Sequence, residues 1–588
     1  MNKYRTHNCG ALRKDNVGGK VRLSGWIDTI RDHGGVIFID LRDHYGTTQI
    51  VIHNEKLIKG LSREYVISVA GVLRERDSDT VNQKIATGEV ELVVESLDVL
   101  SESVNQLPFE VGESTQTRED VRLKYRFLDL RNPAVHQNIV KRAEITRFLR
   151  VKMEELGFLE IQTPILTSSS PEGARDYLVP SRKHHGMFYA LPQAPQQFKQ
   201  LLMVSGFDKY FQIAPCFRDE DARADRSPGE FYQLDFEMAF ATQEDVFEVA
   251  EKVLYDTFSA FSDKKVSPAP FKRIPYAESM LKYGTDKPDL RNPLIIEDLT
   301  GFFSQVDFAP FKNKPVRGIV APGCASSSKS FFEKMLSFAT GIGMKGLGYI
   351  SVLSGQDLES QDLKDKLKGP IVKFLSEDQR QDLIENLNLK ENDTLFFICD
   401  VPKLVDKMAG QIRAELGERL NIINQDAFEM CFITDFPMYE PNEETGAIEF
   451  THNPFSMPQG EMEALKKLNP LDIKAQQYDI VCNGVELSSG AVRNHRPDIM
   501  LKAFEIAGYS QEDIEDKFYA LFNAFHYGAP PHAGMAPGLD RMVMLLTEQE
   551  SIREVVAFPM NSNAQDLLLG APGNVTEQQL REVHIKIR

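Results

Sequence analysis

Short runs in which apolar and polar residues alternate dominate the first hundred positions of the chain. Such alternation is typical of strands with one buried face, and turns rich in glycine, aspartate and asparagine separate the runs. The expected strands are 21–27, 36–41, 48–52, 66–72 and 90–95. Because no long helical pattern intervenes, these closely spaced strands predict a small Greek-key barrel such as the OB-fold.

A helical period replaces this alternation after the polar stretch 101–120. Apolar residues recur at helical spacing through 139–156, and Gly157 provides a stop signal. Strand-like segments separated by polar loops follow to about position 240, and they favour an antiparallel sheet. These segments are 157–166, 209–217 and 231–240.

The segment from 286 to 425 differs again in character. It contains strand-like segments at 345–352 and 393–401 and amphipathic helices at 377–389 and 402–417. The next segments in which polar residues cluster lie after position 425. We therefore interpret it as a separate α+β unit inserted into the second domain.

Charge and composition narrow the classes of protein to consider. The 588 residues carry a net charge of −18, which argues against a protein that coats DNA indiscriminately through summed phosphate contacts. Residues 1–60 nevertheless hold ten Lys and Arg against six Asp and Glu. A basic barrel in an otherwise acidic chain is typical of a nucleic-acid-binding domain. The solvent-facing side of any barrel can, however, carry such charges.

The sequence favours neither a membrane protein nor a protein held together by disulfide bonds. The chain has no run of about 18 apolar residues and no signal-peptide pattern, so we expect a soluble, cytoplasmic protein without a membrane partner. Its six cysteines never approach C-x-x-C spacing, which favours buried free thiols over disulfides or a zinc site.

Three polar clusters are candidates for chemistry. The segment 216–237 places three arginines and five acids between two strand-like pieces, which suits bidentate phosphate binding. Gly538 and Arg541 open an apolar helical pattern whose N-terminus can receive an anion. Asp479 and Glu486, on adjoining strand-like pieces, are suited to Mg²⁺. The plain alternatives are a solvated charged hairpin and carboxylates paired with arginines. Neither a P-loop nor a Rossmann glycine pattern is present.

In order and spacing these segments resemble the class II aminoacyl-tRNA synthetases, and among them the aspartyl-tRNA synthetases of bacterial type. The three family motifs match 157–166 with Pro164, 217–220 through Phe231 and Asp235, and 538–541. Further matching segments are 171–182, 190–202, 451–455 and 530–541. The resemblance implies a homodimeric ligase that makes aspartyl-adenylate and pyrophosphate from L-aspartate and ATP with Mg²⁺, and then transfers aspartate to tRNA(Asp).

The same resemblance implies a division of the chain into domains with multidomain α/β and β architecture. The antiparallel catalytic sheet of a class II synthetase would be split in sequence by the inserted unit, which resembles a GAD-type domain. The expected domains are an OB-fold anticodon-binding barrel (1–105), a hinge (106–120), the first catalytic part (121–285), the inserted domain (286–425), the second catalytic part (426–565) and a C-terminal extension (566–588).

By motif position, the resemblance also assigns roles to single residues. Arg218, Glu220 and Arg541 are the expected catalytic residues, with Arg218 bridging the substrate carboxylate and the α-phosphate. Mg²⁺ is assigned to Asp479 and Glu486. The expected ATP-binding residues are Arg218, Asp219, Glu220, Phe231, Glu486, Gly538, Leu539, Asp540 and Arg541. The expected aspartate-binding residues are Glu172, Gln196, Lys199, Asp235, His452 and Arg493.

The charge of the substrate explains two of these assignments. A side-chain carboxylate needs fixed cations, which Lys199 and Arg493 match, and asparagine would leave those cations unpaired. We accordingly expect Lys199→Met or Arg493→Leu to abolish aspartate activation with the fold intact.

In the barrel, Arg31, Phe38 and Gln49 match anticodon-contacting positions, with an aromatic ring for stacking and an amide for hydrogen bonding. Phe38 could instead belong to the barrel core. His33, in a loop near Asp79, matches family members that charge both tRNA(Asp) and tRNA(Asn).

Several residues depart from the family pattern. The motif 2 loop carries one extra residue, with Ser227 in place of glutamine and Gly229 after it, and Ala194 replaces a common serine. Thr451 to Phe455 read THNPF, and Ile398 to Asp400 replace the Gly-Ala-Asp triplet. The alternatives that remain are a strictly discriminating aspartyl enzyme, an asparaginyl or lysyl enzyme, and an inactive RNA-binding paralogue.

Overall fold

The computed structural model describes residues 2–169, 174–226, 228–354, 362–442 and 444–587. It divides into two compact units, Met1–Glu110 and Val111–Arg588. A search of the described residues finds no helix long and apolar enough to cross a membrane.

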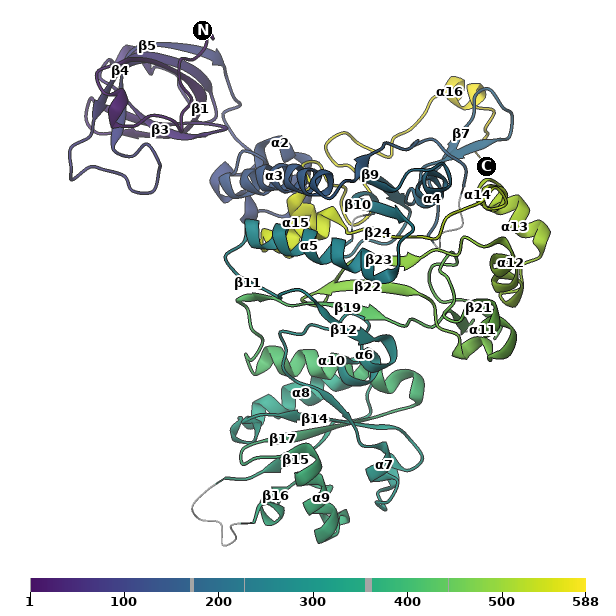
Figure 1. Cartoon of the computed structure of the whole chain (residues 1–588). Helices are drawn as coiled ribbons and strands as arrows, with labels where there is room; N and C mark the ends of the chain where they lie inside the picture. The colour runs from purple at the N-terminus through teal and green to yellow at the C-terminus, as the bar shows by residue number, and fades with distance from the viewer. Residues whose placement is uncertain (1, 170–173, 227, 355–361, 443, 588) are drawn as a thin grey trace. The chain divides into compact units, whose positions relative to one another are not determined.

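The first unit is a closed five-stranded barrel with the strand order β1-β2-β3-β5-β4. Its strands are β1 (Lys20–Asp32), β2 (Ile37–Asp43), β3 (Gly46–Ile52), β4 (Val66–Glu75) and β5 (Val90–Ser101). All five strands predicted from the alternation are confirmed. In each strand the apolar residues at alternate positions, such as Leu23, Ile39 and Leu92, point into the barrel core. The barrel ring is visible in Figure 1.

An eight-stranded, mainly antiparallel sheet forms the centre of the second unit. Its order is β12-β19-β22-β23-β24-β10-β9-β6, so segments from both sides of the inserted unit interleave. The strands are β6 (Leu159–Glu160), β9 (Lys209–Arg218), β10 (Gly229–Ala239), β12 (Lys272–Pro275), β19 (Met430–Thr434), β22 (Gln477–Cys482), β23 (Val485–Val492) and β24 (His532–Met535). The predicted antiparallel sheet is confirmed, but only two residues of 157–166 form a strand.

Helices cover the sheet. One large apolar core joins the sheet to three helices that lie beside it in Figure 1, namely α3 (Pro133–Glu155), α5 (Gln243–Phe261) and α15 (Leu539–Leu546). A second core joins α4 (Gln196–Val204) to α12 (Pro497–Ile506), α13 (Gln511–Lys517) and α14 (Tyr519–Phe525). The helix predicted at 139–156 begins earlier, because the Asn132 side chain caps it by accepting a hydrogen bond from the Ala134 N–H.

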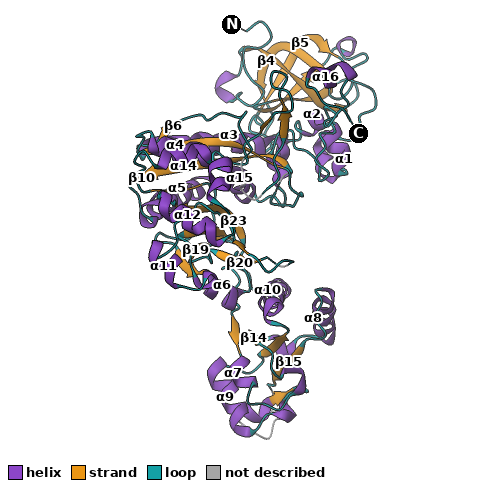
Figure 2. Cartoon of the chain, turned by 90° about the vertical axis from the view of Figure 1, so that its right-hand side faces the viewer, coloured by secondary structure: helices purple, strands orange, loops and turns teal. Residues whose placement is uncertain are grey.

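The inserted segment builds its own antiparallel sheet in the order β13-β14-β17-β15-β16. Figure 2 labels β14 and β15 of this sheet. The strands are β13 (Ile296–Asp298), β14 (Val316–Ala321), β15 (Gly348–Val352), β16 (Leu367–Lys368) and β17 (Thr394–Cys399). Its helices include α8 (Lys329–Gly341), α9 (Glu377–Leu387) and α10 (Pro402–Arg419), and α6 (Tyr276–Tyr283) precedes it. The domain bounds given in the sequence analysis stay predictions. All six cysteines are free thiols, as expected from their spacing.

Candidate active site

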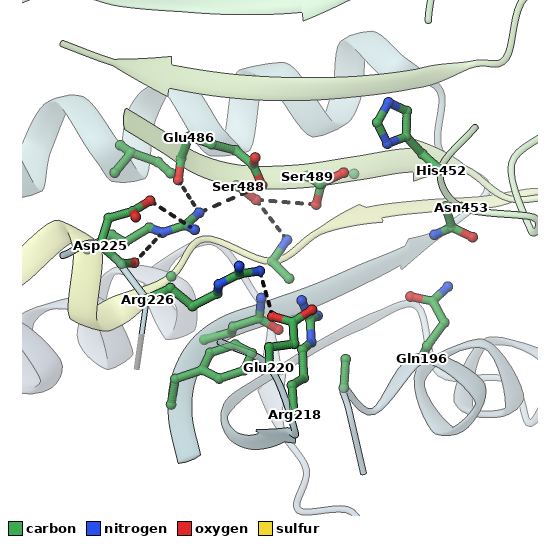
Figure 3. Close-up of a pocket in the computed structure, with 18 of the residues that line it drawn as sticks. Gln196, Arg218, Glu220, Asp225, Arg226, His452, Asn453, Glu486, Ser488 and Ser489 are labelled. Atoms are coloured by element: carbon green, nitrogen blue, oxygen red, sulfur yellow. Dashed lines mark hydrogen bonds and ion pairs between the residues drawn. The ribbon is translucent and has the colours of Figure 1, made fainter. Parts of the chain in front are cut away.

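A cavity of about 700 Å³ lies over the eight-stranded sheet. In Figure 3, Gln196, Arg218 and Glu220 lie across it from Glu486 and Ser489. Most residues predicted for substrate binding line this cavity: Gln196, Lys199, Arg218, Glu220, Phe231, His452, Glu486, Arg493, Gly538, Asp540 and Arg541. Asp219, Asp235, Asp479 and Leu539 do not line it. Glu172 and Ser227 lie outside the described residues.

Arg218 ends β9 and is available to an anion. Its guanidinium stands 5.1 Å from the centre of the Phe231 ring on the paired strand β10, and its Nε donates to the Gln193 carbonyl at 3.4 Å. Within the described ranges, no carboxylate lies within ion-pair distance of it. An unpaired, half-buried arginine in a cavity is a suitable partner for a phosphate.

Glu220 and Arg541 are instead engaged by neighbours. Glu220 accepts a hydrogen bond from Arg226 at 2.8 Å. Arg541 donates to the carbonyls of Asp225 at 3.1 Å and Glu486 at 2.6 Å, and it lies 3.3 Å from the Asp225 carboxylate. The motif 2 loop therefore folds onto the motif 3 helix in this conformation, and the dashed lines in Figure 3 mark these contacts.

The consecutive motif 3 residues point in different directions. Leu539 is buried in the apolar core. Asp540 accepts hydrogen bonds from the Tyr232 N–H at 2.9 Å and from Arg142 at 2.5 Å, so its carboxylate ties α15 to β10 and α3. Gly538 has a φ of −70°, and an added Cβ would meet the nearest atom at an ordinary 3.6 Å. The fold therefore leaves room for a side chain at position 538.

Gly229 lies at the end of the motif 2 loop that departs from the family pattern, and it begins β10. It has a φ of +84°, a conformation that L side chains rarely adopt, and it pairs with Arg218 across the β9–β10 hairpin. A residue with a side chain would be strained at this first position of β10.

Four buried charges form a network at the other end of the cavity. Arg493 donates two hydrogen bonds to Glu237, from Nε at 2.8 Å and from Nη2 at 3.0 Å. Lys199 lies 2.5 Å from Asp235 and 3.7 Å from Glu237. Both acids are 0% exposed and both cations 2%. The two expected substrate-binding cations are therefore already paired, and Nη1 of Arg493 keeps no partner in the described part of the chain.

The two acids of this network differ in pKa. Burial raises the pKa of Asp235, and the charge of Lys199 offsets this only in part. Burial also acts to raise the pKa of Glu237, but Arg493 and Lys199 outweigh it, so that the pKa of Glu237 lies below its ordinary value. Glu237 was missed at the sequence level. It could have been found from its position two residues after Asp235, because residues two apart in a strand such as β10 lie on the same face.

The paired network also corrects one expectation. Arg493→Leu would leave Glu237 buried with its bidentate partner gone, so the fold would not stay unaffected.

His452 and Gln196 complete this end of the cavity (Figure 3). The His452 ring packs edge-on against Phe436, and burial lowers its pKa, which favours the neutral form of the ring. Gln196 is buried, and its Nε2 has no hydrogen-bond partner among the residues described here. An unsatisfied amide at a cavity wall suits a polar substrate group.

Asp479 and Glu486 come from the paired strands β22 and β23. Asp479 is 5% exposed, and its Oδ1 has no hydrogen-bond partner within the described residues. Burial, followed by the nearby Glu486 charge, raises the pKa of Asp479. An orphaned carboxylate oxygen beside a second carboxylate fits a hard divalent cation that completes its shell with phosphate and water oxygens.

On the barrel, three predicted residues, Arg31, Phe38 and Gln49, share one face with Asp40. Arg31 pairs with Phe38, and Asp40 with Gln49, across β1, β2 and β3. Phe38 is only half-buried, lies outside the barrel core and packs edge-on against His33 at 5.5 Å, so it is not a core residue.

The polar side chains of this face are engaged within the barrel. Arg31 is held bidentately by Asp40 at 2.8 and 2.9 Å and donates to Gln49 at 3.2 Å. Gln49 is buried and donates to Glu91. Asp79 lies exposed between β4 and β5.

Comparisons with known proteins agree with this architecture. The family model of class II tRNA synthetases (D, K and N) matches residues 118–562, and that of the OB-fold nucleic acid binding domain matches 21–100. The aspartate--tRNA(Asp/Asn) ligase of Rickettsia canadensis is 54% identical, and that of Rickettsia prowazekii 55%, each match covering 100% of this chain and 98% of the relative.

Solved structures show the same fold. The asparaginyl-tRNA synthetase of Pyrococcus horikoshii, complexed with asparaginyl-adenylate, is 19% identical with a TM-score of 0.56 and covers 94% of this chain and 97% of its own. The aspartyl-tRNA synthetase of Entamoeba histolytica is 17% identical with a TM-score of 0.53, covering 93% and 89%.

Proposed function

Because the chain belongs to the class II tRNA synthetases of the D, K and N group, we propose that it is an aspartate–tRNA ligase acting on both tRNA(Asp) and tRNA(Asn). Full-length identity above half to relatives named for both tRNAs supports this substrate range. The observation that carries the choice of amino acid is that Lys199 and Arg493 lie together at one end of the cavity that also holds Arg218.

The reaction proceeds in two displacements. The α-carboxylate of aspartate attacks the α-phosphorus of ATP, the bond to the bridging oxygen breaks, and pyrophosphate leaves. A ribose hydroxyl at the 3′ end of the tRNA then attacks the acyl carbon, and AMP leaves. Holding two reactants in line supplies much of the acceleration in such steps.

The chain's own residues would position the substrates and stabilise charge. Arg218 would neutralise the charge that develops at the α-phosphate, while Phe231 would support the adenine ring. For Glu220 and Arg541 to reach ATP, the Arg226 and Asp225 contacts must open. Nη1 of Arg493 and the Lys199 ammonium would bind the side-chain carboxylate of aspartate, and Gln196 and Asp235 its ammonium group. A Mg²⁺ held by Asp479 and Glu486 would neutralise phosphate charge.

ATP–pyrophosphate exchange with aspartate, asparagine and lysine tests this function. Exchange should depend on aspartate alone, because the amide of asparagine leaves buried cations unpaired. Exchange with asparagine or lysine would identify one of those enzymes instead, and no exchange with any of the three would identify an inactive paralogue.

The range of tRNAs gives a second prediction. We expect the purified protein to aspartylate tRNA(Asn). We also expect His33→Leu to lower the kcat/KM for tRNA(Asn) about tenfold relative to tRNA(Asp), since His33 packs against the ring of Phe38, an expected anticodon-contacting residue. His53→Leu, at another exposed barrel histidine, is the control. If the wild-type protein charges no tRNA(Asn), the enzyme is of the strict type.

We also propose a cytoplasmic homodimer. The edge strand β6 exposes Leu159, and Phe207 and Phe240 are exposed where β9 begins and β10 ends. Leu159 pairs with Tyr210 across β6 and β9, and Lys209 pairs with Met238 across β9 and β10. The exposed side chains of Leu159, Phe207 and Phe240 therefore lie near one another at the β6 edge of the sheet. Such a patch is typical of a protein interface.

A further inference from the structure

Lys287 is a cation at the cavity that has no role in the mechanism above. Lys287 lies in the loop that joins α6 to the inserted unit, and it lines the same cavity as Arg218 and Arg541. Its Nζ stands 3.2 Å from Oε2 of Glu486 and 2.8 Å from Asp286. Its side chain is 38% exposed, so its ammonium group remains accessible from the cavity.

The inserted unit fixes the loop that carries Lys287. The buried Arg413 of α10 donates to the backbone carbonyls of Leu294 at 2.6 Å, Asn292 at 2.7 Å and Asp289 at 3.0 Å. A guanidinium that satisfies three carbonyls holds such a loop in one conformation, because each of them would be costly to leave unpaired.

Two glycines bring the backbones close at the same place. A Cβ on Gly284, which has a φ of +69°, would lie 2.4 Å from the Gly410 nitrogen of α10. At the β22–β23 turn, a Cβ on Gly484 would stand 3.4 Å from the Asp289 side chain. The loop is therefore packed between α10 and the hairpin that carries Asp479 and Glu486.

We propose that Lys287 is a further ATP-site residue, which binds the phosphate chain of ATP beside Glu486 and competes with the divalent cation for that carboxylate. The inference rests on the proposed use of ATP. A lysine ammonium is a compact charge suited to phosphate, and here it shares Glu486 with Arg541, whose Nη1 lies 3.7 Å from Oε1. The inserted unit would thus contribute to ATP binding by holding Lys287 in place.

The test compares Lys287→Met, Lys287→Arg and the control Lys282→Met, an exposed lysine of α6 paired with Glu278. In pyrophosphate exchange, Lys287→Met should raise the KM for ATP about tenfold and leave the KM for aspartate unchanged, as expected for a lost charge-assisted contact. Lys287→Arg should recover most of the loss. Without nucleotide, Mn²⁺ titrated by electron paramagnetic resonance should bind Lys287→Met about three- to tenfold more tightly, because a competing cation is gone.

The opposite directions of these two effects separate the proposal from a merely structural role. A misplaced loop would weaken both ATP and Mn²⁺ binding, and that result would overturn the proposal, as would an unchanged KM for ATP. If the wild-type protein shows no aspartate-dependent exchange, the proposed function fails, whereas the Mn²⁺ titration still tests the competition at Glu486.

Discussion

Arg493→Leu should abolish aspartate-dependent pyrophosphate exchange and also destabilise the protein by about 3–5 kcal/mol. The loss of activity follows from the loss of the cation expected to bind the substrate carboxylate. The loss of stability follows because Glu237 is 0% exposed and, among the described residues, would keep only Lys199, at 3.7 Å, as an ion-pair partner. Exchange kinetics and urea unfolding measure the two effects separately.

The double variant Arg493→Leu with Glu237→Gln separates structure from function. It removes the orphaned charge, so most of the stability should return, while exchange should stay absent. A double variant as unstable as the single one would show that packing of the guanidinium, and not the buried carboxylate, sets the cost.

The instability of Arg493→Leu should also depend on pH. In the wild-type protein the pKa of Glu237 is lowered below its ordinary 4.5, so its contribution to stability is present above that value and is lost as pH falls through the folded pKa. In the variant, burial without Arg493 would raise the pKa of Glu237. The difference in unfolding free energy should therefore be largest above the raised pKa of the variant, and it should shrink as the pH falls from that value through the lowered pKa of the wild type. A difference that is constant with pH would contradict this origin.

Local pattern was sufficient to predict the barrel, because each strand buries every second residue and needs no distant partner to show it. It was not sufficient at 157–166, where the apolar residues Ile165 and Leu166 are exposed beyond the two-residue strand β6. The pattern there does not reflect burial within one chain, which agrees with the interface proposed above.

At the site, motif order predicted which segments meet and most of the residues that line the cavity, but not how each side chain is engaged there. Successive helical residues point about 100° apart, so Leu539 enters the core and Asp540 is tied to Arg142, while Arg541 reaches the cavity. Lys287 could not be found from the sequence, since its approach to Glu486 depends on how α10 packs against a loop more than a hundred residues earlier.

Arg218→Leu should reduce exchange about 10²–10³-fold, the usual effect of removing one group that stabilises developing charge. Both kcat and kcat/KM should fall, because the contact strengthens as charge builds at the α-phosphate. The matched control is Arg496→Leu, whose exposed guanidinium pairs with Asp498 and Glu461 away from the cavity, and which should leave exchange unchanged.

Unlike Arg493, Arg218 should be nearly neutral for stability. It lacks a carboxylate partner among the described residues, and its contact with the Phe231 ring is worth only about 0.5–1 kcal/mol. An arginine that lines a cavity without a carboxylate partner among the described residues contributes little to the stability of the fold, which favours a role in binding a ligand. Unfolding free energies of wild type and Arg218→Leu within about 1 kcal/mol, together with the lost exchange, would assign Arg218 to the reaction. A large loss of stability would mean that a structural contact of Arg218 had been overlooked.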